Sequence, residues 1–401
     1  NVQVKIFPDI KNFNDKKIDI NQFSNISIEE ILQREEIPPI PKLLNKNIYK
    51  KTVLITGCGG SIGSELCRQI LRISPNKIIC LDNSEFALYK ISEELKKIKK
   101  FLKSKVLLQF ELCSIIDSHL LELIFNENKI DTIYHAAAYK QVPLVEENVI
   151  SAVKNNVFGT QNLVRLSYKY SIKNFTLISS DKAVRPTNIM GATKRIAELI
   201  CLSLYNSQQN TKFSIVRFGN VIGSSGSVIP LFENQIKDGG PLTITHKKIE
   251  RYFMTINEAV GLVIQSSAMS EGKDIFVLDM GKPVKIIDLA FRMVKLMGFE
   301  PTIFKRKSEK NSKFILIKFI GLRAGEKLYE ELFLDNQSVK TSHPRIFKTY
   351  ETFTEKKQLS LILTTLTKFV EKKDILKIKK CLNKKPIFYK NINQWDILLS
   401  L

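Results

Sequence analysis

The sequence has few of the residues that build disulfide frameworks and metal sites. Its 401 residues include six cysteines and four histidines, and no two cysteines form a CxxC pair. Neither a disulfide scaffold nor a structural zinc site is expected, and we predict no bound metal. Because most of the cysteines lie within apolar runs, we predict buried, reduced thiols in a cytoplasmic protein.

Long hydrophobic runs are missing as well. No apolar stretch reaches the roughly 18 residues that a membrane-spanning helix needs, and no signal-peptide pattern opens the chain. The first residue is Asn1 rather than methionine, so we expect that a segment upstream has been removed. Membrane attachment is therefore expected only through a region outside this sequence.

Negative charge is scarce, because 62 Lys and Arg residues stand against 40 Asp and Glu residues and give a formal net charge of +22. Such an excess attracts nucleotides, nucleic acids or acidic membrane surfaces. The lysines are spread along the chain, however, without a zinc finger, an RNA-binding signature or a basic heptad repeat. We interpret them as a solvated surface and expect no nucleic-acid partner.

From Lys51 onward, short β-branched runs alternate with amphipathic helical segments. This alternation is typical of βαβ units in a parallel sheet. We therefore predict an α/β fold of the Rossmann type, with a doubly wound parallel sheet and a smaller C-terminal substrate-binding lobe. The predicted strands cover residues 53–56, 77–81, 106–110, 130–135, 175–179 and 213–217, and two of the predicted helices cover residues 152–170 and 191–205.

The regular alternation ends after Gly219, where Gly/Ser/Pro-rich turns begin. We assign the extended segments 242–245 and 275–279 to the smaller lobe. The polar N-terminal stretch is broken by prolines, with one helical pattern at residues 28–34. The predicted parts are an N-terminal arm or linker (1–50), a dinucleotide-binding domain (51–225), a nucleotide-sugar-binding lobe partly interleaved with it (226–350) and a helical cap (351–401).

A glycine-rich turn joins the first predicted strand to the first helix. In G-C-G-G-S-I-G, the residues Gly57, Gly60 and Gly63 have the GxxGxxG spacing. The first glycine permits the tight turn, the second lets a pyrophosphate approach the backbone, and the third lets the helix pack on the strand. The pyrophosphate would bind at the helix N-terminus, beside Ser61 and Ile62. The alternative is a tight turn that binds no ligand.

An acidic residue and a run of small residues complete this pattern. Asp82 follows the second predicted strand, where a carboxylate can accept hydrogen bonds from ribose hydroxyls and repels a 2′-phosphate, which favours NAD over NADP. It could instead cap a helix. The fourth predicted strand leads into Ala136 and Ala137, which would let a cofactor lie against the backbone. We interpret His135, at the end of this strand, as a core histidine.

Four motifs follow one another along the chain: T-G-C-G-G-S-I-G, H-A-A-A-Y-K, S-S-D-K and M-G-A-T-K. Their order resembles the extended short-chain dehydrogenase/reductase superfamily. Within it, the chain resembles the UDP-N-acetylglucosamine 4,6-dehydratases that retain the configuration at C5, the bacillosamine-pathway type. The later segments R-F-G-N-V-I-G, R-Y-F-M-T and G-L-R-A-G-E-K-L-Y-E-E-L agree, so the resemblance covers residues 51–346.

This resemblance implies NAD as cofactor and UDP-N-acetylglucosamine as substrate, in the first step of a bacterial glycan pathway. Hydride would move from C4 to NAD, water would leave across C5–C6, and hydride would return to C6. Such an elimination needs an acid and a base. The resemblance assigns these roles to Asp181 and Lys182, with Ser180 hydrogen-bonded to the C4 oxygen. A neutral Lys182 requires a lowered pKa, from burial or nearby positive charge.

Met190 stands where the superfamily usually has its acid/base tyrosine, four residues before Lys194. The two residues share one helix face, and Lys194 would orient the nicotinamide ribose. The methionine sulfur has no titratable proton, so oxidation or epimerisation through a phenol is disfavoured. The C5-inverting dehydratases would have tyrosine here, so Met190 favours retention. The alternatives are an inverting dehydratase and a non-catalytic NAD-binding regulator.

Arginines suit the diphosphate of a UDP-sugar, and the resembling segments contain Arg251 and Arg323. Either arginine could instead form a surface salt bridge. Tyr139 and Lys140 follow the alanine run and would border the hexose, although they could also be packing and solvent groups. The further substrate-binding candidates are Asn220, Ser227, Val228, Thr243 and Glu326.

The resemblance also concerns partners and location. It implies a catalytic region on the cytoplasmic face of the inner membrane, below membrane helices that lie upstream. It further implies that copies associate through the helices at residues 152–170 and 191–205, so a homo-oligomer, dimeric or larger, is expected.

Overall fold

Nine strands form the central sheet of the protein, for which a computed structural model describes residues 37–205, 211–224, 226–304, 313–333, 338–351, 355–387 and 389–390. The expected helix at residues 28–34 and residues 391–401 of the expected cap lie outside the described residues. The strands are β1 (Thr52–Thr56), β2 (Lys77–Asp82), β3 (Leu107–Leu112), β4 (Thr132–His135), β5 (Asn174–Ile178), β6 (Lys212–Arg217), β11 (Lys273–Leu278), β15 (Ser338–Lys340) and β16 (Ile346–Thr349).

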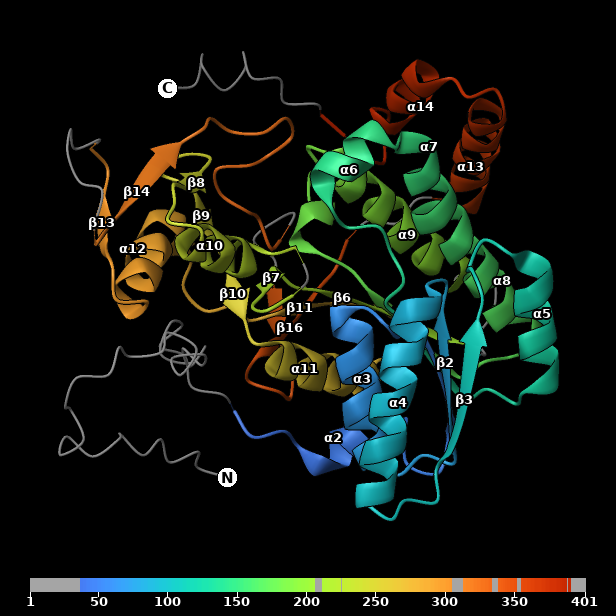
Figure 1. The fold of residues 1–401 in the computed structure, drawn as a ribbon. Coiled ribbons are helices and arrows are strands. Elements are labelled where there is room, and N and C mark those ends of the chain that lie inside the picture. The colour runs from blue at the N-terminus through green and yellow to red at the C-terminus, as the bar shows by residue number, and fades with distance from the viewer. Residues whose placement is uncertain are drawn as a thin grey trace.

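The strand order is β15-β16-β11-β6-β5-β4-β1-β2-β3 (Figure 1). Strands β1 to β6 and β11 run parallel, whereas β16 and β15 extend one edge in antiparallel fashion. The chain winds outward in one direction from β1 to β3 and in the other direction from β4. This reversal is the switch point at which open α/β sheets bind their ligands. The predicted α/β class is confirmed.

Helices cover both faces of the sheet. One face is covered by α3 (Ser61–Arg72), α4 (Glu85–Phe101) and α11 (Ile256–Met269), with α2 (Pro41–Lys46) packed on α11. The other face is covered by α5 (Ser118–Glu127), α8 (Thr160–Lys169) and α9 (Ile189–Tyr205), and the chain reaches α8 through α6 (Val142–Glu147), α7 (Val149–Ala152) and the π-helix η3 (Val153–Gly159).

Alternation along each strand fills a separate core on each face. In β1, Leu54 belongs to the core beneath α8 and α9, whereas Val53 and Ile55 belong to the core beneath α3 and α11. Burial on both faces explains why the parallel strands are continuous runs of apolar residues. All six cysteines are free and buried, as predicted.

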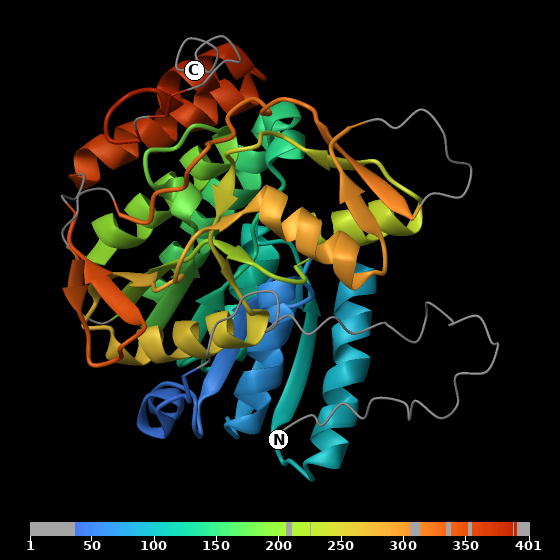
Figure 2. The same cartoon turned by 90° about the vertical axis from the view of Figure 1, so that its left-hand side faces the viewer.

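The C-terminal helices α13 (Lys356–Glu371) and α14 (Ile375–Leu382) pack beside α9, as Figure 2 shows in red and green. Their side chains Leu359, Leu366 and Leu382 join the same core as the α9 residues. All α9 side chains that the structure describes, residues 189–203, are buried. The face of α9 that we expected to meet a second copy is therefore filled within the chain, and the homo-oligomer stays a prediction.

A smaller lobe lies beside the carboxyl ends of the parallel strands (Figure 1). Its core contains Phe232, Leu242, Met293 and Ile315. Its elements are α10 (Val228–Lys237), α12 (Ile286–Leu296) and the strands β8 (Leu242–Ile244), β13 (Glu300–Thr302) and β14 (Phe314–Phe319). Two short strand pairs connect it to the sheet, β7 (Asn220–Val221) with β10 (Phe253–Met254) and β9 (Glu250–Arg251) with β12 (Val284–Lys285).

One strand assignment from the sequence is wrong. The segment at residues 275–279 was expected in the smaller lobe, but β11 pairs in parallel with β6 and belongs to the central sheet. Ile275 faces one core of the sheet and Phe276 the other, so a strand buried on both faces explains this apolar run. The four-part division of the chain stays a prediction.

Within the described part of the chain, no helix is both long enough and apolar enough to cross a bilayer.

Candidate active site

The turn between β1 and α3 can exist only with glycine at two of its positions. Gly57 has φ +67°, and a Cβ atom there would lie 2.7 Å from the Cα atom of Ala137. A Cβ atom on Gly63 would lie 1.9 Å from the carbonyl oxygen of Gly57. Gly60 is the N-cap residue of α3. The glycines thus bring the helix N-terminus against the strand end, and the dipole of a helix favours an anion at this end.

Asp82 lies beside this turn, at the end of β2. Its carboxylate accepts hydrogen bonds from the backbone N–H groups of Gly59 (2.8 Å) and Ser84 (3.0 Å). Each oxygen keeps a lone pair for a further donor. Together with Gly57, Gly60, Ala136, Ala137 and Tyr139, Asp82 lines a cavity of about 280 Å³, called here the smaller cavity.

His135 is a core residue, as interpreted from the sequence. Its Nδ1 and Nε2 atoms form hydrogen bonds with Thr56 (2.7 Å) and Thr160 (2.9 Å). Burial, reinforced by the charge of Lys194, lowers the pKa of His135 to about 3. The imidazole is therefore neutral at physiological pH and serves to join β4, β1 and α8.

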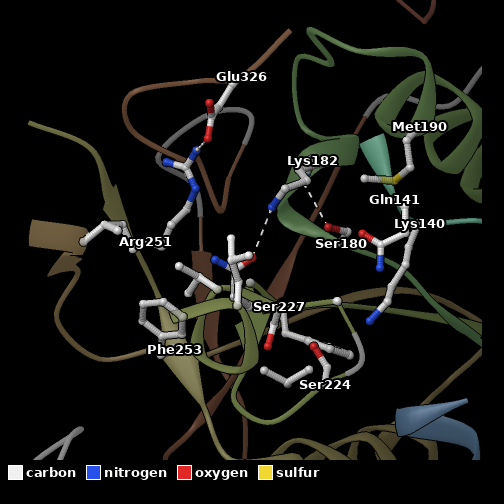
Figure 3. A pocket seen from close by; sticks show the side chains of 18 of the residues that line it. Lys140, Gln141, Ser180, Lys182, Met190, Ser224, Ser227, Arg251, Phe253 and Glu326 are labelled. Atoms are coloured by element: carbon white, nitrogen blue, oxygen red, sulfur yellow. Dashed lines mark hydrogen bonds and ion pairs between the residues drawn. The ribbon is translucent and has the colours of Figure 1, made fainter. Parts of the chain in front are cut away.

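A second cavity of about 390 Å³, called here the larger cavity, lies between the carboxyl ends of the central strands and the smaller lobe (Figure 3). It gathers candidate residues that are up to 264 positions apart in the sequence, from Ile62 to Glu326. The predicted site residues that line it are Ile62, Ala136, Lys140, Ser180, Lys182, Met190, Lys194, Asn220, Ser227, Val228, Thr243, Arg251, Arg323 and Glu326.

Tyr139 was expected beside the hexose with Lys140, but the structure separates the two side chains. Tyr139 lines the smaller cavity, whereas Lys140 lines the larger one. The side chain of Asn156 binds both the N–H group of Tyr139 (2.8 Å) and its carbonyl oxygen (3.0 Å). These two hydrogen bonds fix the backbone at Tyr139. The side chains of Tyr139 and Lys140 therefore stay at different cavities.

Ser180, Asp181 and Lys182 form a compact hydrogen-bonded unit just after β5, where Asp181 begins the short 3-10 helix η4 (Asp181–Ala183). The Ser180 hydroxyl donates to Asp181 Oδ1 at 2.8 Å, and Lys182 Nζ lies 3.1 Å from the same oxygen. Asp181 is buried, and its Oδ2 atom has no hydrogen-bond partner among the described residues. Asp181 Oδ2 can therefore still form a hydrogen bond, and it belongs to a carboxyl group that is paired with the Lys182 amine.

The amine of Lys182 has three oxygen neighbours. Besides Asp181 Oδ1, it lies 3.3 Å from Glu330 Oε1 and 3.4 Å from Asn220 Oδ1. Burial lowers the pKa of Lys182, but the charges of Asp181 and Glu330 outweigh it and leave the pKa raised. The lowered pKa that we expected is therefore wrong for this structure, in which Lys182 is an ammonium ion.

Met190 and Lys194 project from α9 into the larger cavity, and Figure 3 shows Met190 on the side of the cavity where Ser180 and Lys140 lie. Lys194 Nζ donates a hydrogen bond of 2.5 Å to the carbonyl oxygen of Ile178 at the end of β5. Burial lowers the pKa of Lys194 to about 8. The shared helix face predicted from their spacing is thus confirmed.

On the opposite side of the larger cavity, Arg251 is held between two glutamates. Its Nη2 atom lies 3.3 Å from Glu326 Oε1, and its Nε atom lies 3.6 Å from Glu330 Oε1. Glu326 also accepts the backbone N–H of Arg323 at 3.1 Å. The salt-bridge alternative for Arg251 is therefore correct in part, since this arginine is paired and still borders the cavity.

Glu330 is the functional candidate that sequence reasoning missed. It lies in the segment Y-E-E-L beside Glu331, and nothing in the sequence distinguishes the two. In the structure Glu330 is buried and pairs with Lys182 and Arg251, which line the larger cavity, whereas Glu331 pairs with Arg185 and Lys327 toward the surface. The two glutamates have different partners only because of the path that the chain takes after β14.

A buried ion network supports the catalytic segment from behind. Arg217 is fully buried, and its guanidinium bonds Glu198 through Nε (2.7 Å) and Nη2 (2.7 Å) and also contacts Glu351. Arg195 bonds the same two glutamates, and the hydroxyl of Ser179 donates to Glu198 at 2.6 Å. The network joins β6, α9 and the C-terminal segment to the residue that precedes Ser180.

In the described residues, no group of three or more His, Cys, Asp or Glu side chains could hold a metal ion.

The comparisons with known proteins show the family to which this chain belongs. The family described as polysaccharide biosynthesis protein matches residues 53–351. The capsular polysaccharide biosynthesis protein CapD of Staphylococcus aureus is 40% identical over 378 residues, which cover 94% of this chain and 61% of CapD. This chain therefore spans about three-fifths of the length of that relative.

Two further matches cover most of the matched protein. An inverting UDP-N-acetylglucosamine 4,6-dehydratase of Campylobacter jejuni is 30% identical over 297 residues, which cover 72% of this chain and 79% of that enzyme. The X-ray structure of Pen from Bacillus thuringiensis aligns with a TM-score of 0.66 and 30% identity, over 79% of this chain and 98% of Pen.

Proposed function

Because this chain belongs to the polysaccharide biosynthesis protein family and has the extended short-chain dehydrogenase/reductase fold, we propose that it is an NAD-dependent nucleotide-sugar 4,6-dehydratase. We propose UDP-N-acetylglucosamine as substrate and retention of configuration at C5. The observation that carries the proposal is the ion pair between the buried Asp181 and Lys182, because Lys182 lines one cavity with Met190 and Lys194. This set can perform an elimination but lacks the phenol of an ordinary dehydrogenase.

The residues around the glycine turn fit NAD. A Cβ atom on Gly57 or Gly63 would collide with backbone, which supports a turn kept open for a pyrophosphate at the α3 N-terminus. Asp82 would accept hydrogen bonds from the hydroxyls of the adenosine ribose, and Lys194 would bind the nicotinamide ribose. When bound, NAD supplies the acceptor for the C4 hydride and its donor to C6.

Proton transfer is the task of Asp181 and Lys182. In the structure they are an ion pair, with 3.1 Å between Nζ and Oδ1. If one proton moves from Lys182 to Asp181, the same pair becomes a neutral base and a neutral acid. Lys182 then takes the C5 proton, and Asp181 gives its proton to the C6 hydroxyl that leaves as water. The proton that the C4 hydroxyl loses with the hydride passes to solvent, and an equivalent proton restores the ammonium form of Lys182 after it has returned its proton to C5. Retention follows if Lys182 returns the proton to the face of C5 from which it took it.

Met190 supports a dehydratase in preference to an epimerase. It occupies the cavity wall near the catalytic segment, and its thioether can neither take nor give a proton. Arg251 and Arg323 line the opposite part of the cavity and suit the diphosphate, whose charge would compete with Glu326 for Arg251.

Proton NMR of the purified chain with UDP-N-acetylglucosamine in deuterated water, without added NAD, tests this function. A 4-keto-6-deoxy product with deuterium at C5 is expected, and the coupling constant at C5 should show retention. The inverting relative makes inversion the second candidate, which the same coupling constant would reveal. Unchanged substrate, also after addition of NAD, would refute the proposed reaction and support a non-catalytic NAD-binding regulator.

The cytoplasmic location and the homo-oligomeric assembly expected from the sequence stay predictions.

A further inference from the structure

Glu330 is a buried carboxylate that joins the two functional cations of the larger cavity. Its side chain is only 3% exposed. Its Oε1 atom lies 3.3 Å from Lys182 Nζ and 3.6 Å from Arg251 Nε, and its Oε2 atom has no hydrogen-bond partner among the described residues. A buried charge destabilises a protein unless it is paired with an opposite charge and hydrogen-bonded.

The geometry around Lys182 suggests the role of Glu330. An ammonium ion has three N–H donors, and Nζ has three oxygen neighbours, on Asp181, Glu330 and Asn220. When Asp181 takes one proton, the remaining two hydrogens can stay on Glu330 and Asn220. The lone pair of the neutral amine then points in the third direction, toward Asp181.

The charges that face Lys182 come from three elements. Asp181 lies on η4 itself, Arg251 on β9, and Glu330 on the segment after β14. Lys194, on α9, lines the same cavity, but its amine is bound to the carbonyl oxygen of Ile178. Glu330 is thus the second negative charge on Lys182, beyond the one supplied by its catalytic partner.

We propose that Glu330 is a positioning residue of the dehydratase: its carboxylate fixes the direction of the Lys182 amine, ties it to the arginine that binds diphosphate, and favours its protonated form in the empty site. This inference rests on the proposed function, in which Lys182 is the base. It adds a positioning residue, Glu330, to the catalytic residues that the sequence motifs predict, which are Ser180, Asp181, Lys182, Met190 and Lys194.

The first test uses the charge of Glu330. In E330Q the amide oxygen can still accept a hydrogen bond, but the negative charge is gone, so the pKa of Lys182 should fall. The acidic limb of the kcat/KM-against-pH profile, which reports the substrate-free enzyme, should then move to lower pH by about one unit or more. The matched control E331Q changes the neighbouring glutamate, which pairs with Arg185 and Lys327, and should keep the wild-type limb.

The second test needs no turnover. The pH dependence with which acetic anhydride labels Lys182 in the substrate-free protein, followed by mass spectrometry, reports the pKa of its amine. We expect labelling of E330Q to begin at lower pH than labelling of wild type and E331Q. If both the labelling and the kcat/KM profile of E330Q coincide with those of wild type, the inference is overturned. If wild type makes no product from any UDP-hexose, the proposed function fails, and the labelling still decides whether Glu330 sets the charge of Lys182.

The hydrogen-bond role is tested by E330M, which removes the acceptor but keeps the length of the side chain. It should lower kcat at the optimum pH at least about tenfold. E330D, which keeps a carboxylate, should recover part of that loss. The content of bound NAD at the assay temperature should stay at the wild-type level, which separates misplacement of the amine from unfolding. A wild-type kcat in E330M would overturn the positioning role.

Discussion

Replacement of Glu198 by glutamine should destabilise the protein more than any surface change. Glu198 lies on α9, fully buried, and accepts two hydrogen bonds of 2.7 Å from Arg217. It also binds Arg195 (3.0 Å) and the hydroxyl of Ser179 (2.6 Å). Glutamine has nearly the same shape, so the substitution removes the charge and leaves no cavity.

The magnitude follows from the charge balance of the network. Two arginines, Arg195 and Arg217, face two glutamates, Glu198 and Glu351, so the charges cancel. E198Q leaves one positive charge in excess in a site that water does not reach. Removal of one partner from a buried pair costs about 3–5 kcal/mol, and we expect the free energy of unfolding at pH 7 to fall by this amount.

The pH dependence gives a second check. Burial raises the pKa of Glu198, but the charge and hydrogen bonds of Arg217 and the charge of Arg195 outweigh it and lower the pKa to about 2. The folded-state pKa is therefore below the unfolded value of about 4.3. Its stabilisation is complete above that unfolded value and is lost as the pH falls toward 2. The difference between wild type and E198Q should narrow over this range.

Urea denaturation followed by far-UV circular dichroism, at pH 7 and at several lower pH values, measures both quantities. E94Q is the matched control, because Glu94 forms a partly exposed pair with Arg68. Such a pair contributes less than about 1 kcal/mol. If E198Q destabilises the protein no more than E94Q does, or if its effect is the same at every pH, the reasoning about the buried network is refuted.

Three further outcomes are expected. G63A should lose bound NAD, measured after acid release, because its Cβ atom would lie 1.9 Å from the Gly57 carbonyl oxygen. The control G261A should keep NAD, because its Cβ atom would have its nearest neighbour at 3.7 Å. Equal NAD contents in the two variants would contradict this prediction. M190L should keep turnover within about threefold of wild type, since leucine preserves the volume and no proton is involved, whereas a hundredfold loss would give the sulfur a role. D181N should lower turnover about 10²–10⁴-fold with NAD retained, and a wild-type rate would remove Asp181 from the acid role.

The sequence by itself determined the parallel sheet and the position of the candidate site. Strand runs such as residues 53–56 and 77–81 are apolar because both faces of the sheet are covered, and this local pattern can be read without coordinates. The glycine turn could also be predicted, because its conformation and contacts exclude any Cβ atom at Gly57 and Gly63. The catalytic candidates follow one strand, so their clustering depends only on the alternation of strands and helices.

Only the tertiary structure decided which residues face each other across that site. The protonation of Lys182 depends on Glu330, which comes from a segment 148 positions later and looks the same as Glu331 in the sequence. The membership of β11 in the central sheet and the cover of α9 by α13 are likewise contacts between distant segments. A pattern of residues determines the local structure of a segment, whereas charge and burial at a site depend on what the rest of the chain brings beside it.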